Sequence, residues 1–381
     1  MKQQVPNFTV DAMTVRVVTD AILVPYKDKD TWESNHACLI SSKGIVPESI
    51  HRRGKRNQTQ TTKHFDFSDE IDKNFIESYH DLSINYVYGG LINDHFGHFL
   101  AECIHRIWGF NQAEYPKKII FVADNCKNHE DVAYKDVFAG WQIQILQLLR
   151  VDPNDIIVVS QRTHFARIIV PTQASTLGPS TIASNKYICS LLSLAKWQNK
   201  KGLARDKIFI SRSKLRPYLG IIVGQSYIEN LYARSGFKII HPQEFNICEQ
   251  INFYANASEI VFVEGSAIHI LEIVSKLPRA KKVLVLSRGG FAHKQLRAIE
   301  SILKPRIKDF LIQPELMKLP IVLLGRDDQN KITPAYRQSG AWSPLSHFSI
   351  YIPSNNMYSV LSDQMRYIKT CLIDLILHFH D

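Results

Sequence analysis

The sequence predicts an α/β protein of two domains, each with parallel strands that alternate with helices. Its 381 residues exceed the size of one ordinary hydrophobic core. Short apolar runs typical of strands alternate with helical runs in both halves, as βα units require. A hydrophilic stretch at residues 197–202 separates the two halves and is typical of a linker.

From this pattern we expect one domain at residues 1–200 and a compact Rossmann-like domain at residues 201–330. Residues 331–381 are expected to form an extension. Its last run, Tyr358 to Phe379, carries one apolar stripe and is expected to be a helix that packs back on the protein. Charged residues interrupt this run, which argues against a membrane anchor.

The first half is expected to hold several short strands, two helices and an exposed loop. Residues 49–72 are charged and rich in Thr, Gln and Asn, as loops often are. The helical pattern runs from Ile92 to Phe110, and a second helix is expected near Trp141 to Arg150. The expected strands are Val15 to Val24, His36 to Ile40, Lys118 to Ala123, Ile156 to Ser160 and Ala166 to Pro171.

The second half alternates more cleanly. Gly236 follows a helical run, as a residue just past a helix end commonly does. The expected helices are Gln225 to Ser235, Glu249 to Ala257 and Ser266 to Lys276. The expected strands are Lys207 to Ile210, Phe237 to Ile240, Ile260 to Val263 and Lys282 to Ser287.

Composition and charge exclude several classes of protein. The formal net charge is +10, but the basic residues are spread thinly and are not interleaved with aromatic residues. We therefore expect no nucleic-acid partner, and at most a weak contact with an anionic membrane surface. The first residues show no apolar run followed by a small-residue cleavage site, so we expect no export, and the six cysteines form no C-x-x-C pair. A cytoplasmic location with buried, reduced thiols is the expectation, with a peripheral position on the inner membrane face left open.

A polar stripe crosses the expected helix at residues 92–110. Asp94, His98, Glu102 and Arg106 recur at every fourth position and would share one side of the helix. Two interpretations stay open. Either His98 and Glu102 form a structural network, or the stripe lines a cleft and supplies a general base. The base would then be His98, oriented by Glu102, or else Asp94 or His95, and His95 and Arg106 are the expected acceptor-side residues.

Two strand-to-helix turns in the second half predict a phosphate site. The first expected strand ends in Ser211-Arg212-Ser213-Lys214-Leu215-Arg216, whose arginines and hydroxyls suit phosphate. The third ends in Glu264-Gly265-Ser266, where small residues open a helix whose free N–H groups attract anions. The G-x-G-x-x-G and P-loop patterns are absent, which disfavours a Rossmann dehydrogenase or an ordinary ATPase.

The blocks DHFGHFLAECIHRIW, KIFISRSKLRPYL and GFKIIHPQEFNICEQINFYANASEIVFVEGSAIHIL resemble bacterial members of glycosyltransferase family 61. The resemblance implies a GT-B-like fold of two Rossmann-like domains facing a cleft, with the donor nucleotide in the C-terminal domain and the acceptor against the N-terminal one. It also implies inverting transfer with no cofactor and no obligatory metal. Positions matching the family's motifs are His98, Glu102, Arg106, Arg212, Glu249, Gln250, Gly265 and Ser266. Many relatives carry His where this chain has Glu264, and a His stands instead at position 269, so the residue that contacts the donor sugar stays open.

The resemblance further implies a nucleotide-sugar donor, a glycan or lipid-linked glycan acceptor, and a role in capsule or lipopolysaccharide synthesis. A second resemblance competes with the first. The segment EGSAIHILE is similar to the Glu-x7-Glu helix of the retaining glycosyltransferase family 4, with Glu264 and Glu272 at its two ends. His269 lies between them and joins the expected donor site. A non-catalytic nucleotide- or carbohydrate-binding relative is the remaining alternative.

Overall fold

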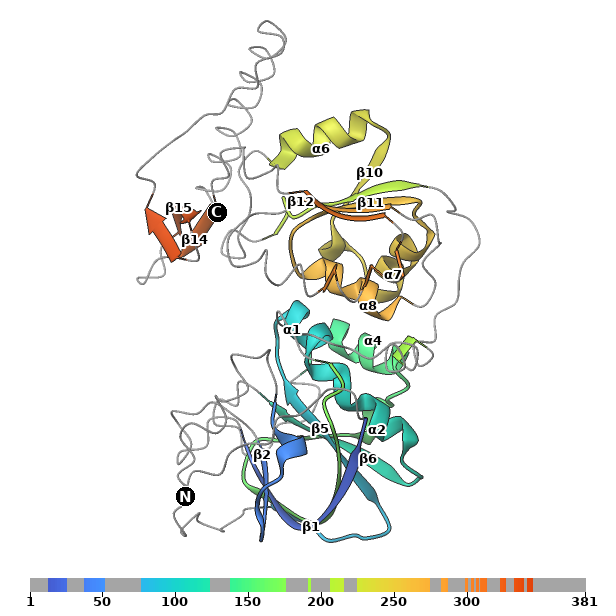
Figure 1. Ribbon diagram of the computed structural model, residues 1–381, viewed down its shortest axis with the longest axis vertical. Coiled ribbons are helices and arrows are strands. Elements are labelled where there is room, and N and C mark those ends of the chain that lie inside the picture. Colours follow the sequence, from blue (N-terminus) through green and yellow to red (C-terminus); the bar gives the residue numbers. More distant parts are fainter. Residues whose placement is uncertain are drawn as a thin grey trace, which may run out of the picture. The chain divides into compact units, whose positions relative to one another are not determined.

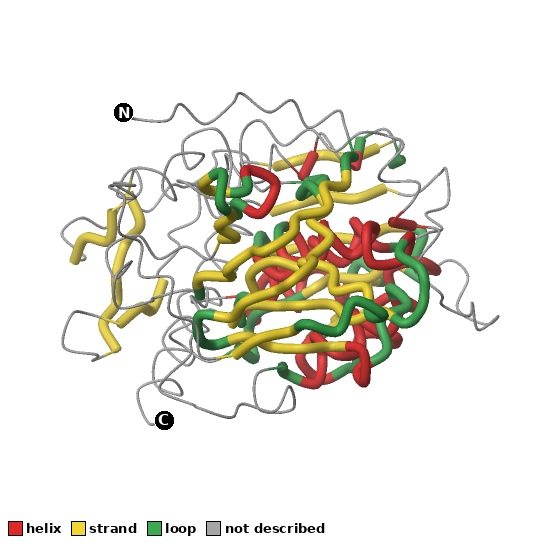
Figure 2. The backbone as a smooth tube through the Cα atoms, turned by 90° about the horizontal axis from the view of Figure 1, so that it is seen from below, coloured by secondary structure: helices red, strands yellow, loops and turns green. Residues whose placement is uncertain are grey.

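The computed structural model divides the chain into two compact units, Met1–Gln198 and Asn199–Asp381. Figure 1 traces the chain and labels its elements, and Figure 2 distinguishes the strands from the short helices. The residues that the structure describes are 13–25, 38–51, 77–123, 138–175, 191–192, 206–215, 225–274, 282–286, 299–300, 303–304, 306–307, 309–313, 323–326, 332–338 and 341–344. The expected helix at 358–379 lies outside them.

The first unit is built on an eight-stranded mixed sheet. Its order is β3-β2-β1-β8-β5-β6-β7, with β4 beside β8. Strands β4 to β8 pair in parallel, whereas β1, β2 and β3 pair antiparallel. The strands are β1 (Val15–Val24), β2 (Cys38–Ser41), β3 (Gly44–Ile45), β4 (Glu77–Tyr79), β5 (Asn85–Ile92), β6 (Lys117–Ala123), β7 (Ile156–Val159) and β8 (Thr163–Pro171). The antiparallel edge departs from the Rossmann-like sheet expected for this half.

Strand β5 was not expected, and its two glycines explain why. Gly89 and Gly90 are poor strand formers, but the structure requires a glycine at each position. A β-carbon on Gly89 would lie 2.7 Å from the ring of Phe121 on β6. Gly90 has a φ of +92° at a register shift in the strand, which is a conformation that favours glycine.

The expected helix at residues 92–110 is broken into three pieces, α1 (Phe96–Ala101), the 3₁₀ turn η2 (Cys103–Arg106) and α2 (Ile107–Gln112). Glu102 separates the first two with a φ of −133°, which is not helical. His95 is the N-cap of α1, because its side chain accepts a hydrogen bond from the His98 backbone N–H. Asp94 therefore precedes the helix, and the single four-residue stripe predicted from the sequence is wrong.

Two further 3₁₀ turns, η1 (Pro47–Ser49) and η3 (Pro153–Asp155), and the helix α4 (Gly140–Leu148) complete the described first unit. Helices α1, α2 and α4 lie on one side of the sheet (Figure 1). A core cluster on the sheet joins strands from its antiparallel and parallel parts, including Leu23, Leu39, Tyr88, Ile120 and Val159. The sheet thus shares one hydrophobic core across both parts.

The second unit is a five-stranded, fully parallel sheet with the order β10-β9-β11-β12-β13. Its strands are β9 (Lys207–Ile210), β10 (Phe237–Ile240), β11 (Glu259–Val263), β12 (Lys282–Leu286) and β13 (Asp309–Gln313). The bounds of β9 and β10 are those predicted, and Gly236 has the positive φ of +82° expected past a helix end. A small antiparallel sheet of β14 (Leu323–Arg326), β15 (Ile332–Gln338) and β16 (Ala341–Pro344) follows in the chain.

Helices cover both faces of the parallel sheet (Figure 1). Helix α6 (Gln225–Arg234) packs on one face through Ile228, against Phe209 and Val261. On the other face lie α7 (Ile247–Asn256) and α8 (Ile270–Ile273), with the 3₁₀ turns η5 (Pro242–Glu244) and η6 (Ser266–His269) before them in the chain. The ring of Tyr254 on α7 meets that of Phe262 at 5.5 Å. This unit is therefore a doubly wound α/β fold.

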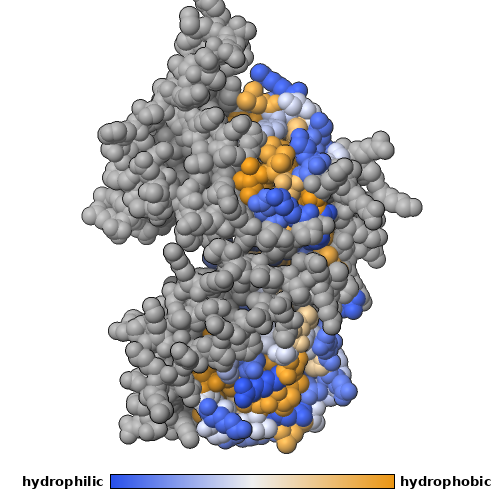
Figure 3. All heavy atoms as spheres, viewed as in Figure 1, coloured by the Kyte–Doolittle hydropathy of each residue, from blue (hydrophilic) through white to orange (hydrophobic). Residues whose placement is uncertain are grey.

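The surface of the described residues is mixed in character. Hydrophilic and hydrophobic residues are interspersed on the visible described surface of each unit (Figure 3). Among the cysteines, Cys38 and Cys103 are buried as expected, but Cys248 is exposed. In the part of the chain that the structure describes, no helix is long and apolar enough to cross a membrane.

Candidate functional site

The two turns singled out in the second half lie at the same edge of the parallel sheet. Ser211 follows β9 directly, and Glu264 follows β11 directly. The two strands are neighbours and run parallel, with Ile210 paired to Phe262. In the order β10-β9-β11-β12-β13 the direction of winding reverses between β9 and β11. Ligands of open α/β sheets bind at the carboxyl ends of the strands at such a switch point.

Arg212 and Gly265 lie against each other at this edge. A β-carbon built on Gly265 would overlap Nη1 of Arg212 and would lie 3.0 Å from its Cζ. The φ of Gly265 is 170°, an extended conformation that any residue adopts. Glycine is therefore needed here for the space that the guanidinium occupies, and the Gly-Ser turn and the arginine act as one feature.

The loop that carries Arg212 is held from below by buried polar side chains. Ser211 is buried, and its hydroxyl bonds Glu229 of α6 and the backbone N–H of Ser213 at 3.0 Å. The amide of Gln225 satisfies both its ends when its oxygen accepts from the backbone N–H groups of Arg212 at 2.6 Å and Ser213 at 3.2 Å. The backbone N–H groups of Arg212 and Ser213 are thus used inside the loop, and a phosphate bound to this loop would have to be held by side chains. The side chains of Arg212 and Ser213 are half-buried, whereas Ser211 is buried and supports the loop.

The helix expected after Gly265 is much shorter than predicted. Residues Ser266–His269 form the 3₁₀ turn η6, and α8 continues only to Ile273. The described helix thus ends three residues before the predicted end at Lys276. A short helix has a small dipole, so the anion attraction expected from this N-terminus is weaker than the sequence suggested. Ser266 stands at the start of η6, at the same sheet edge.

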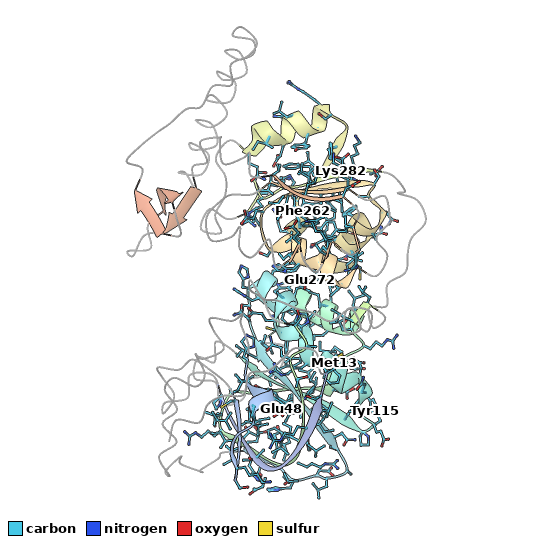
Figure 4. The ribbon with its side chains drawn as sticks, viewed as in Figure 1. Met13, Glu48, Tyr115, Phe262, Glu272 and Lys282 are labelled. Atoms are coloured by element: carbon cyan, nitrogen blue, oxygen red, sulfur yellow. The ribbon has the colours of Figure 1, made fainter. Side chains whose placement is uncertain are left out.

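The acidic and imidazole groups of this segment are buried. Glu264 is 3% exposed, and His269 and Glu272 are 7% and 5% exposed. Nδ1 of His269 lies 2.7 Å from Oε1 of Glu272, one helical turn on. Figure 4 shows Glu272 on the side of α7 and α8, below the sheet that contains Phe262. The guanidinium of Arg306 caps the end of α8 by donating to the carbonyls of Leu271 and Val274.

The remaining residues of the predicted phosphate set contribute less. Arg216 lies outside the described residues. Nζ of Lys214 is exposed and pairs with Oε1 of Glu244 at 2.7 Å. Beside them, His241 follows β10 and is largely buried. Burial lowers its pKa below the ordinary value, and the positive charge of Lys214 acts in the same direction, while Glu229 and Glu244 oppose it.

In the first unit, two histidines flank the buried carboxylate of Glu102. Oε2 of Glu102 lies 3.1 Å from Nε2 of His51, and Oε1 lies 3.4 Å from Nδ1 of His98. The carboxylate side chain is fully buried, whereas the His98 side chain is 26% exposed. Nδ1 of His98 is buried and makes no hydrogen bond within the described residues, so the carboxylate faces it at contact distance only, and Nε2 is the second ring nitrogen. A carboxylate that faces one imidazole nitrogen is the arrangement expected around a general base.

The other stripe residues are separated from this pair. Asp94 and His95 are exposed ahead of α1, and the ring of His95 lies 4.8 Å from that of His98. Arg106 is 1% exposed. Its Nη2 donates to the carbonyls of Glu48 at 3.0 Å and Ile50 at 2.8 Å. Arg106 therefore has a structural role in the first unit, and the acceptor-side role expected from the sequence has no support in these contacts.

A comparison with protein-family models found a match in the middle of the chain. Residues 96–276, a little under half of the chain, match the model described as Glycosyltransferase 61. This region is similar to glycosyltransferase family 61. The protein is therefore a glycosyltransferase, an enzyme that uses a sugar donor and a glycan acceptor. The family 61 region begins at α1 and ends just after α8, so it includes His98, Glu102, Arg212 and Gly265. No curated protein matches the chain at the threshold applied.

Two residues of the candidate sites could not be predicted from the sequence. His51 was assigned to a charged loop, and it lies outside the family 61 region. Gln225 was treated as an ordinary first residue of a helix. No local signal points to either, because each acts through a contact with a residue far along the chain. Within the described residues, no group of three or more His, Cys, Asp or Glu side chains is placed to hold a metal. The independence from metal implied by the family resemblance stays a prediction.

Proposed function

We propose that this enzyme transfers a sugar from a nucleotide-sugar donor to a glycan or lipid-linked glycan acceptor with inversion. The donor phosphates would be bound at the carboxyl edge of the parallel sheet, by Arg212 and Ser213 beside the Gly265-Ser266 turn. The observation that carries this proposal is the packing of Arg212 against Gly265 at the switch point between β9 and β11. A guanidinium fixed there suits a phosphate, which it can bind through two parallel hydrogen bonds.

Charge stabilisation of the leaving group is the chemical task of this edge. As the bond between the sugar and the phosphate breaks, negative charge develops on the phosphate oxygens. Arg212 would stabilise that charge without reorganising, because the buried contacts of Ser211 and Gln225 fix its loop in advance. Such a site needs no metal for this step, and we propose none.

The proposed general base is His98 in the first unit. Its Nε2 would take the proton from the acceptor hydroxyl while the buried carboxylate of Glu102 stabilises the imidazolium through Nδ1. Asp94, exposed ahead of the helix, is the second candidate for the base. By the family resemblance, we further propose a role in capsule or lipopolysaccharide synthesis in the cytoplasm, on or near the inner membrane face.

The retaining alternative, which uses Glu264 and Glu272, is less favoured by the contacts. Oε1 of Glu272 is bound to His269 at 2.7 Å inside the protein. A carboxylate engaged in this way orients the imidazole rather than a donor ribose. We therefore propose that His269, held by Glu272, faces the donor sugar. His269 would then contact the donor sugar in this chain, in place of the histidine that many relatives carry at the position of Glu264.

The test combines a donor screen with two variants of one loop. The protein is incubated with UDP-, GDP- and CMP-sugars, and NMR of the product identifies the donor and its anomeric outcome. Arg212→Ala is expected to raise the donor KM by about 10- to 100-fold, the loss of one charged phosphate contact. Lys214→Ala is the control, because Lys214 is exposed and already paired with Glu244. Equal donor KM for Arg212→Ala and the unmodified enzyme would overturn the phosphate site, and a retained anomeric configuration would overturn inversion.

A further inference from the structure

The carboxylate of Glu102 requires two partners, and one of them comes from a distant part of the chain. Its side chain is fully buried, and an ionised buried carboxylate costs several kcal/mol unless it is paired and hydrogen-bonded. His98 contacts one oxygen at 3.4 Å, and His51 contacts the other at the shorter distance of 3.1 Å. Of these two histidines, His51 therefore lies closer to the carboxylate.

The two imidazoles differ in what their second nitrogen can do. The His51 side chain is only 9% exposed, and within the described part of the chain its Nδ1 is buried without a hydrogen-bond partner. It offers no atom to a substrate. The His98 side chain is 26% exposed. Its Nδ1 lies 3.4 Å from Oε1 of Glu102 and is likewise buried without a hydrogen bond within the described residues, so Nε2 is the nitrogen that remains for proton transfer. One histidine is thus suited to hold the carboxylate, and the other to act as a base.

The segment that carries His51 is itself held in place by the same helical region. Arg106, four residues after Glu102, donates to the carbonyls of Glu48 and Ile50 on either side of Ser49. The hydroxyl of Ser49 accepts from the backbone N–H of Leu39 at 2.9 Å. Figure 4 marks Glu48 in the first unit. His51 follows these residues directly, so the backbone that carries its ring is held in place.

We infer that His51 is a positioning residue that fixes Glu102, and through it the tautomer and orientation of His98. The inference rests on the proposed role of His98 as the base. With His51 donating from Nε2 to Oε2, the other oxygen of Glu102 is directed at Nδ1 of His98. The negative charge on Oε1, 3.4 Å from Nδ1, would favour the neutral tautomer of His98 that has its proton on Nδ1 and its acceptor at Nε2. Within the described residues, the other charged or titratable groups close to this cluster in the chain or in space include His95, whose ring meets that of His98, Asp94, which precedes it in the chain, and Arg106.

The test compares two substitutions at position 51 that differ in one hydrogen bond. The amide nitrogen of His51→Gln can reach the place of Nε2 and still donate to Glu102, whereas His51→Leu cannot. The full-length protein is labelled with ¹⁵N-histidine and studied by NMR at about pH 8, where an ordinary imidazole is neutral. The His98 signals are assigned by their loss in His98→Gln. In the wild-type protein and in His51→Gln we expect Nε2 of His98 to be the unprotonated nitrogen, and in His51→Leu a mixture of both tautomers.

A kinetic measurement accompanies the spectrum. With the sugar nucleotide that the enzyme hydrolyses fastest, His51→Leu is expected to lower kcat by about 10-fold or more at unchanged donor KM, because a misplaced base is a poor base. His51→Gln should restore kcat to within about 3-fold of the wild-type value. His98→Gln should lower kcat by about 100-fold, as removal of a general base does.

The outcomes separate the inference from the proposed function. If the His98 tautomer is the same in His51→Leu as in the wild-type protein, the inference is overturned. It is also overturned if Leu and Gln at position 51 lower kcat equally, since only a packing role would then remain. If His98→Gln leaves kcat unchanged, the proposed base is wrong, while the tautomer measurement still reports whether His51 positions Glu102.

Discussion

The guanidinium of Arg212 occupies the space that a side chain at Gly265 would need. The two residues follow neighbouring parallel strands, β9 and β11, and they are more than fifty positions apart in the chain. Neither residue defines a site by itself. Together they explain why a glycine in an extended conformation is required after β11, and they connect the Ser-Arg-Ser loop to the Gly-Ser turn.

Replacing Gly265 by Ala should displace the Arg212 guanidinium without unfolding the protein. The atoms nearest the new β-carbon are the end of a flexible side chain, which can move. We expect the donor KM to rise by about 10-fold, as for loss of one hydrogen bond to a charged group, with a change in unfolding free energy below about 1 kcal/mol. Donor titration and chemical denaturation of the same variant measure the two quantities.

The matched control is Gly140→Ala at the start of α4. A β-carbon there would meet nothing within 4 Å, and alanine favours a helix by about 0.5–1 kcal/mol. This variant should keep the donor KM and gain slightly in stability. An unchanged donor KM in Gly265→Ala would show that the position of Arg212 does not matter for the donor.

Two arginines reach Glu48, and only one of them should matter for stability. Arg106 is buried and donates to the Glu48 carbonyl, whereas Arg16 is 41% exposed at its side chain and pairs with Oε2 of Glu48 at 3.3 Å. Arg106→Ala should cost about 3–5 kcal/mol, because buried carbonyls lose their donor and a cavity opens. Arg16→Ala should cost less than about 1 kcal/mol, as exposed ion pairs do. Urea denaturation followed by circular dichroism compares them, and equal losses would contradict the structural role of Arg106.

The parallel sheet of the second unit was largely predictable from sequence, because its strands are short apolar runs bounded by clear breaks. The strands and helices of the first unit were less predictable from sequence. Gly89-Gly90 made β5 look like a break, although Gly89 leaves room for the ring of Phe121 on β6 and Gly90 has a positive φ. The apolar run at residues 92–110 fits one helix, but Glu102 leaves the helical conformation and turns its carboxylate toward His51. Periodicity reports which residues are apolar, and it cannot report such a tertiary contact.

The candidate sites show the same limit. Arg212 and Gly265 could be singled out because residues after parallel strands are expected at one sheet edge. Their mutual contact, the support from Gln225 and the role of His51 depend on contacts between separate segments. Arg106 fitted the polar stripe by spacing alone, and its buried bonds to the Glu48 and Ile50 carbonyls belong to the fold instead.

Gln225→Leu should loosen the Ser-Arg-Ser loop from within. The side chain is fully buried, and its amide satisfies the backbone N–H groups of Arg212 and Ser213. Leucine has a similar size but no acceptor, so the loop loses these bonds. We expect a loss of about 1–3 kcal/mol in unfolding free energy, together with a several-fold rise in donor KM. Gln243→Ala, at an exposed position of η5, is the control and should change neither quantity. A loss of stability at constant donor KM would show that the loop's rigidity is irrelevant to the donor.

His241 should make the second unit less stable in mild acid. Burial lowers the pKa of its imidazole, so the unfolded chain, with an ordinary pKa of about 6.5, binds the proton more readily than the folded protein does. The contribution of His241 to the free energy of unfolding is therefore fully present above about pH 7. It is lost as the pH falls through about 6.5 toward the lower pKa of the folded state. In His241→Gln this contribution is absent, and the unfolding free energy should fall less steeply between about pH 7 and pH 5 than in the wild-type protein. Gln243→Ala removes no titratable group and should retain the wild-type slope. Denaturation curves at a series of pH values measure these slopes, and a slope in His241→Gln equal to that of the wild-type protein would show that His241 is not the group responsible.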